Sequence, residues 1–216
     1  MNTERRRPAL LALIMVMGVG PFATDTYLAA LPEMQDALST SPTVVQLTLT
    51  AFIVGMAAGQ LLLGPLSDSY GRRRLLLTCT LVFTVLSVVC AASPDGTVLV
   101  AARLVQGIVG GGGVAIGRAV VTDTHHGDRA AATFGVITSF TFLGPILAPA
   151  AGGLILAHGT WRTVFAALAG LGLLMVLGVA MAVFFAAAFV LMCFVTRAGG
   201  PRRRPGARTS AAGPGA

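Results

Sequence analysis

The chain has 216 residues, of which 55% are hydrophobic and only 11% charged, with a formal net charge of +7 at pH 7. This composition excludes an ordinary soluble domain and is typical of a polytopic membrane protein. All basic residues are arginines in short clusters between apolar runs, a pattern that sets membrane topology and excludes nucleic-acid binding as the reason for the charge. Because no nucleophile–base pair, phosphate-binding loop or metal-ligand cluster occurs, we expect no enzyme, no metal site and no cofactor.

Six apolar runs are long enough to cross a hydrocarbon core of about 30 Å, which takes roughly 20 helical residues. In chain order they cover residues 8–31, 44–63, 75–92, 98–121, 130–157 and 163–195. Connections rich in Pro, Ser, Asp and Gly, which favour turns, separate them. We therefore predict an all-α integral membrane domain of six transmembrane helices over residues 1–196.

The arginines predict the orientation of this domain. If the six helices alternate in direction, Arg162 falls on one side, Arg103 lies within a run, and all the others fall on the opposite side. By the positive-inside rule that opposite side, with both termini, is cytoplasmic. A signal peptide is the alternative for the first run, but the run continues to Leu31 and no clear cleavage site closes it.

The last run is longer than a membrane requires. Residues 163–196 carry no charge, and 32 of these residues in a single helix would extend about 48 Å. Residues 197–216 are rich in Gly, Pro, Arg and Ala and have nothing to bury. We predict that they form a disordered basic tail.

A polar stretch, GPLSDSYGRRR at residues 64–74, joins the second and third runs. Gly64 and Gly71 allow tight backbone geometry at the helix ends, and Asp68 places an acid beside a helix terminus. Three consecutive arginines, which prefer the inner leaflet, follow as Arg72, Arg73 and Arg74. The stretch predicts a clasp between helices; the alternative is that the arginines only anchor the topology.

Asp25 and Arg103 are the two charged residues that lie well inside the predicted spans, where burying a charge is expensive. Counted along their helices, each lies on the order of 8–9 Å below the outer surface, so the two could pair. A carboxylate beside an arginine stays ionised until a proton or a cation displaces the pairing, which is the competition that an antiporter needs. A static salt bridge between helices is the alternative.

Small and polar residues mark further candidate positions. The many glycines of the fourth run, together with Gly152 and Gly153 of the fifth, allow close helix packing, while Pro145 and Pro149 should bend the fifth helix. Four polar side chains are candidates to line a cavity, although hydrogen bonds between helices are the more ordinary explanation: Tyr27, Gln46, Gln60 and Gln106. In the turn after the fourth run, we expect His125 and His126 to be solvated, and Asp123 and Asp128 to pair with Arg118 or Arg129.

These motifs resemble those of the major facilitator superfamily. Residues 64–74 are similar to the family's loop signature between helices 2 and 3, and RLVQG at 103–107 is similar to an element of its proton-coupled members. GPILAPAAGG, with Gly144, Pro145, Pro149, Gly152 and Gly153, resembles the helix 5 motif of its antiporters. DTYLAALP at 25–32 and WRTVF at 161–165 resemble segments of Bcr/CflA-type multidrug exporters, with Ala29 in place of the usual proline.

The resemblance implies a drug/proton antiporter in the bacterial cytoplasmic membrane, a role associated with antibiotic resistance. Asp25 and Arg103 would carry proton coupling or bind substrate, and residues 64–74 would gate the cytoplasmic side. A proton gradient would supply the energy, and a cationic or amphipathic small molecule would be the substrate. A metabolite uptake carrier is an alternative that the helix 5 motif disfavours.

The resemblance covers about residues 10–180, which is one half of a twelve-helix transporter. After about Ala182 the sequence departs from the family pattern, and we interpret this as a truncated or out-of-frame C-terminus. Activity would then require a homodimer or the missing C-terminal half. The alternative is a non-transporting membrane remnant or an assembly partner.

Overall fold

The computed structural model describes residues 6–124 and 127–198, all of whose regular elements are α-helices. Six long helices and one short helix follow each other in these ranges: α1 (Arg6–Leu28), α2 (Leu31–Ala37), α3 (Pro42–Tyr70), α4 (Arg72–Ala91), α5 (Gly96–Thr124), α6 (Asp128–His158) and α7 (Trp161–Ala198). Each of the six predicted apolar runs overlaps one long helix. The short helix α2 was not predicted, because its seven residues lie in a polar connection.

Five helices, α3 to α7, are long and apolar enough to cross a membrane. The prediction of a multi-pass, all-helical protein is therefore confirmed for the described residues. Helix α1 is not among the five, so six crossings and cytoplasmic termini stay predictions. The predicted tail falls almost entirely outside the described residues, except that α7 continues through Arg197 to Ala198.

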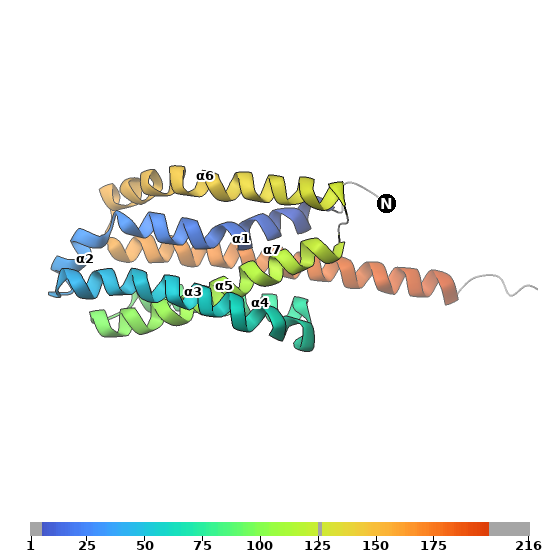
Figure 1. Cartoon of the computed structure of the whole chain (residues 1–216), viewed down its shortest axis with the longest axis horizontal. Coiled ribbons are helices and arrows are strands. Elements are labelled where there is room, and N and C mark those ends of the chain that lie inside the picture. The colour runs from blue at the N-terminus through green and yellow to red at the C-terminus, as the bar shows by residue number, and fades with distance from the viewer. Residues whose placement is uncertain (1–5, 125–126, 199–216) are drawn as a thin grey trace, which may run out of the picture. The chain divides into compact units, whose positions relative to one another are not determined.

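The chain divides into two units, residues 1–183 and 184–216. Of the second, the structure describes the helical residues 184–198. Within the first unit the long helices run alternately up and down, and α2 lies at the end where α1 stops (Figure 1). We refer to this end as the α2 end and to the opposite end, which holds the α3–α4 junction, as the α4 start.

Glycines set the closest helix pairing, that of α3 with α5. A Cβ atom at Gly55 or Gly59 of α3 would overlap a backbone carbonyl oxygen of α5, and one at Gly107 or Gly111 of α5 would overlap a carbonyl oxygen of α3. Small residues on both faces therefore let the two backbones touch, which is how helices associate where lipid removes the hydrophobic driving force. The α1–α6 and α4–α5 pairs have the next most extensive contacts.

Replacing Gly111 by alanine is expected to destabilise the bundle by about 1–3 kcal/mol, because the new methyl group would collide with the carbonyl oxygen of Met56. Gly170→Ala is the matched control, since nothing lies within 4 Å of a Cβ atom built there. The control should be neutral or stabilising by up to about 1 kcal/mol. Unfolding of both variants in detergent, followed by circular dichroism, measures the difference. Equal effects of the two substitutions would contradict this account of the α3–α5 contact.

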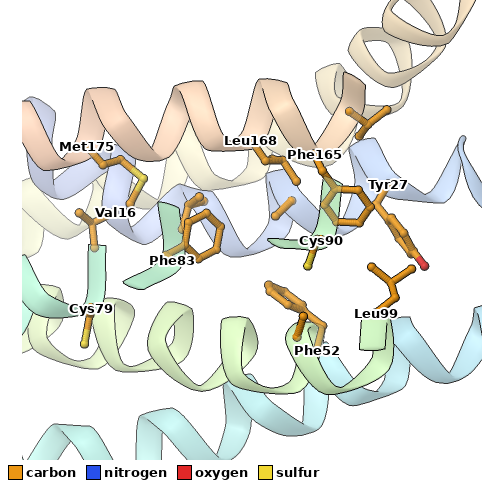
Figure 2. Close-up of a cluster of buried hydrophobic side chains, with 14 of the residues drawn as sticks. Val16, Tyr27, Phe52, Cys79, Phe83, Cys90, Leu99, Phe165, Leu168 and Met175 are labelled. Atoms are coloured by element: carbon orange, nitrogen blue, oxygen red, sulfur yellow. The ribbon is translucent and has the colours of Figure 1, made fainter. Parts of the chain in front are cut away.

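The main core of the first unit is formed by α1, α3, α4, α5 and α7, together with Met34 of α2. Figure 2 shows Val16, Cys79, Phe83 and Met175 in one part of this core, and Tyr27, Phe52, Leu99 and Phe165 in another. Three of the large aromatic rings in the second part lie around the buried guanidinium of α5.

Candidate functional site

Arg103 is the centre of the candidate site, with a side chain that is completely buried on α5. Its guanidinium carbon lies 4.1 Å from the ring centroid of Phe52, 4.7 Å from that of Tyr27 and 5.7 Å from that of Phe165. These rings come from α3, α1 and α7, so helices from across the bundle enclose one cation. An arginine against desolvated aromatic faces gains about 2 kcal/mol per good contact, which offsets part of the cost of burying its charge.

The hydrogen bonds of Arg103 leave part of its guanidinium edge unused. Nη1 donates to Oε1 of Gln106 at 3.0 Å, one turn further along α5. Among the described residues, neither Nε nor Nη2 has a hydrogen-bond acceptor. Buried donors without a partner are rare and costly. These two nitrogens could therefore donate hydrogen bonds to an anionic or carbonyl oxygen of a ligand or of another side chain.

Gln106 is the polar partner that orients Arg103. Its Nε2 donates to Oγ of Ser87 at 2.8 Å, and Ser87 in turn donates to the carbonyl of Phe83 on α4. Since the carboxamide donates on one side and accepts on the other, its orientation is determined by both contacts. Gln106 was predicted as a cavity residue, and the structure places it in an interhelical network, which was the more ordinary interpretation.

Tyr27 forms a second polar contact beside the arginine. Its hydroxyl is hydrogen-bonded to the hydroxyl of Thr48 on α3 and lies 3.5 Å from the carbonyl oxygen of Val45. Tyr27 is fully buried and its ring is packed on Phe165 at 5.6 Å between centroids. Thus one side chain of α1 reaches both α3 and α7.

Asp25 does not pair with Arg103 in this structure. Its side chain is half-buried on α1, and both ion pairs found among the described residues are made by Arg72. The expected pairing rested on equal depth along two helices, but depth leaves the rotation of each helix undetermined. In this structure the guanidinium contacts three aromatic rings and the carboxamide of Gln106 instead.

The GPILAPAAGG motif of residues 144–153, named after helix 5 of the family, lies on α6 in this structure. Its Gly152 brings the motif next to Asp25. A Cβ atom at this position of α6 would overlap the carbonyl oxygen of Thr26, so α6 touches α1 one residue from the acid. The other members of the motif are more open: Gly144 is half-buried, and Pro145, Pro149 and Gly153 are exposed. Helix α6 continues through both prolines from Asp128 to His158.

A hollow of about 190 Å³ lies beside Gly144, between α1, α6 and α7. Its walls include Phe22, Phe140 and Leu171, and they are almost entirely apolar. This hollow could accept the hydrophobic part of a ligand. The remaining predicted cavity residues lie on α3, where Gln46 is exposed and Gln60 is half-buried.

The polar stretch at the α4 start is mostly helical rather than a loop. Gly64 and Asp68 belong to the last turns of α3, and Gly71, with φ of 89°, ends this helix in a conformation that favours glycine. Arg72 begins α4, followed by the exposed Arg73 and Arg74. The prediction of a clasp at helix ends has a direct structural counterpart in the contacts of Arg72.

Arg72 connects three helix ends. It forms an ion pair with Asp68 at 3.1 Å, another with Asp123 near the end of α5, and its Nη1 donates to the carbonyl oxygen of Ala119 at 2.6 Å. The structure thus gives Asp123 a partner that was not predicted, from the α3–α4 junction, while its pairing with Arg129 stays a prediction. His125 and His126 lie outside the described residues, as does the side chain of Arg129.

The Arg72–Asp123 pair should contribute about 0.5–1 kcal/mol, because both side chains are partly exposed. A double-mutant cycle of Arg72→Gln and Asp123→Asn, read by unfolding in detergent, is expected to show this coupling at low salt and less of it at high salt. The cycle of Arg73→Gln with Asp123→Asn is the control and should show none. Equal coupling in both cycles would mean that the general positive charge, and not this contact, acts on Asp123.

Several residues of the site were not predicted. Phe52 was treated as an ordinary apolar residue and Phe165 only as the end of the WRTVF motif, although an arginine inside an apolar run is a signal that aromatic faces will surround it. Asp123 could be found only from the packing of α5 against the α3–α4 junction. Within the residues that the structure describes, no group of three or more His, Cys, Asp or Glu side chains could hold a metal ion.

Comparison with known proteins agrees with this fold. The family profile described as Major Facilitator Superfamily matches residues 10–214. The MFS-type transporter YdgK of Bacillus subtilis is 41% identical over 182 residues, which cover 83% of this chain and 45% of that protein. A bicyclomycin resistance protein homolog of Haemophilus influenzae is 34% identical over 165 residues, covering 76% of this chain and 42% of the relative. The multidrug resistance protein MdtL of Salmonella typhimurium is 28% identical over 154 residues, covering 71% and 39%.

Solved structures share the fold at low sequence identity. A bacterial homolog of the human lysosomal transporter Spinster, in an inward-facing conformation, has a TM-score of 0.71 at 18% identity, over 84% of this chain and 44% of that one. A D-xylose–proton symporter has a TM-score of 0.61 at 16% identity, over 88% and 52%. The chain spans less than half the length of the curated relatives it matches.

The helical fold, the apolar spans and these matches agree with one another. This chain belongs to the major facilitator superfamily of multi-pass membrane transporters.

Proposed function

We propose that the chain forms one half of a proton-coupled exporter of the Bcr/CflA multidrug type, located in the bacterial cytoplasmic membrane. The relatives named for bicyclomycin and multidrug resistance support export of small molecules. The helix 5 motif supports antiport over uptake, because the resemblance associates it with exporters. The D-xylose–proton symporter shares the fold alone and does not favour a sugar substrate.

The observation that carries the proposal is the buried guanidinium of Arg103 with no carboxylate partner among the described residues. A permanent positive charge with unpaired N–H groups attracts an anion, and Asp25, on α1, is the one acid that lies within the predicted spans. A rearrangement that brings Asp25 to Arg103 would favour the ionised acid and release its proton. Withdrawal from Arg103 would let Asp25 take up a proton or bind a cation.

A cationic, partly apolar substrate fits these groups. Ionised Asp25 supplies the charge that attracts a cation, and the apolar hollow beside Phe22, Phe140 and Leu171 lies on the same helix, α1, and on α6 and α7. Proton and substrate would then compete for one carboxylate, which couples their movement in opposite directions. No cofactor enters this cycle.

The contacts of Arg72 would act as the gate at the α4 start. They hold the ends of α3, α4 and α5 together, and a change of access would have to break or rearrange them. Alternating access also needs a second half to move against. We propose that a second copy of this chain or a separate six-helix half supplies it.

The test is gradient-driven movement of ethidium, a cationic and aromatic probe, into inverted membrane vesicles that contain this chain. A proton gradient that is acid inside should drive accumulation, and collapsing the gradient with a protonophore should abolish it. Vesicles without the chain are the control. If the chain is inserted but no gradient-dependent movement occurs, the exporter proposal fails for this chain, and the non-transporting membrane protein is the better description.

A further inference from the structure

Trp161 begins α7 at the α2 end and is held there from two sides. Its backbone N–H donates to Oε2 of Glu33 on α2 at 3.1 Å. The first N–H groups of a helix have no partner within the helix, and a carboxylate there also interacts favourably with the helix dipole. Glu33 therefore caps α7 from a residue far away in the chain and determines where this helix begins.

Arg162, the next residue of α7, connects the start of this helix to the end of α4. Its Nη1 donates to the carbonyl oxygens of Ala91 at 2.7 Å and Ser93 at 3.1 Å, which satisfies acceptors at the end of α4. Its guanidinium carbon also lies 4.3 Å from the ring centroid of Trp161. The indole is thus covered by a cation on one side, and it is almost completely buried.

One side chain, that of Phe165, contacts both Trp161 and Arg103 and so connects them. One turn further along α7, Phe165 meets the indole edge to face, with 6.1 Å between ring centroids and planes at 90°. Phe165 also contacts the ring of Tyr27 and lies 5.7 Å from the guanidinium carbon of Arg103. The continuous path therefore runs from Glu33 and Arg162 through Trp161 and Phe165 to Arg103.

We propose that Trp161 is a positioning residue for Arg103: fixed by Glu33 and Arg162, it sets Phe165, and Phe165 sets the place of the guanidinium among the three rings. The role of this path in transport rests on the function proposed above, whereas the path itself does not. Its consequence is that the connection at the α2 end controls how readily Arg103 leaves its aromatic site to meet an anion.

The first experiment reads the path without transport. Trp161 is the only tryptophan of the chain, so its fluorescence in the whole protein reports on this position alone. Arg103→Met is expected to shift the emission maximum and to change quenching by acrylamide. In the Phe165→Leu background the same substitution should cause no further shift. Arg118→Met, an exposed position on the same helix, is the control and should leave the emission unchanged.

Two results would overturn the proposal. In one, Arg103→Met leaves the emission of Trp161 unchanged. In the other, Arg103→Met causes the same shift in the Phe165→Leu background as in the unmodified chain. Circular dichroism of each variant shows whether it is folded. Because Phe165→Leu is a large change, Phe165→Tyr serves as a second background, which keeps the ring and should keep the shift.

The second experiment asks whether the path matters for exchange. In the ethidium assay, Glu33→Ala is expected to move the pH midpoint of gradient-driven accumulation, while Glu33→Gln should restore it because a carboxamide oxygen can still accept from Trp161 N–H. Asp36→Ala, exposed on the same helix α2, is the control. A lower rate with an unmoved midpoint would contradict positioning and mean a structural cap alone. If the chain moves no ethidium, the exporter proposal fails, and the fluorescence result still decides the path.

Discussion

Arg103→Met is expected to make the bundle more stable and to abolish gradient-driven drug movement. Methionine is also unbranched and flexible but is shorter and carries no charge, so it removes the cost of burying a guanidinium that has no carboxylate partner among the described residues. Replacing buried ionic groups by apolar residues of similar volume is often stabilising by about 1–4 kcal/mol. An ordinary structural residue would not show opposite effects on stability and activity, whereas a functional charge kept at a cost to the fold would.

Unfolding in detergent and the ethidium assay on the same preparations measure the two effects. Arg118→Met is the matched control, because it removes an exposed arginine from the same helix and should change the free energy of unfolding by less than about 0.5 kcal/mol. If Arg103→Met were instead strongly destabilising, the aromatic contacts and Gln106 would more than compensate for the buried charge. Arg103 would then be a structural residue.

Asp25→Asn is expected to remove gradient-driven accumulation while leaving the fold and the binding of ethidium at neutral pH partly intact. Asparagine has nearly the same shape but cannot exchange a proton, so the variant loses the group at which proton and cation compete. A coupling free energy of only ~1.4 kcal/mol between proton binding and ethidium binding would already change the affinity for ethidium tenfold. Because Asp25 is only half-buried, the substitution should alter stability little.

Accumulation of ethidium over a range of imposed gradients provides the measurement. Asp36→Asn, an exposed acid on α2, is the control and should behave as the unmodified chain. Full activity of Asp25→Asn would remove Asp25 from the proton path, and another acid would have to be sought. A loss of activity in both variants would point to the overall charge rather than to one carboxylate.

The helices could be predicted well because membrane spans are long apolar runs between turn residues, and each run has a helix in the described chain. The helix ends were less predictable. Helix α3 continues past its apolar run to Tyr70, because a helix that leaves the membrane can go on with polar residues such as Asp68. The short helix α2 was missed because it lies in a polar connection that no apolar run marks.

The candidate site could be predicted in its residues but not in its contacts. Asp25 and Arg103 stood out as charges within apolar runs, and Arg72 stood out in a motif. Which side chain each one meets depends on the rotation and packing of helices, which no pattern along the chain specifies. The partner of Arg72 on α5 and the three rings around Arg103 are therefore results of the structure.

The interlocking glycines of α3 and α5 have a mechanical consequence. Because the backbones touch at Gly55, Gly59, Gly107 and Gly111, neither helix can slide or turn without the other, and the pair would move as one stiff lever. Arg103 and Asp123 lie on this lever about 30 Å apart. A small tilt of the α3–α5 pair at Arg103 would therefore cause a larger displacement at the ion pairs of Arg72 with Asp68 and Asp123.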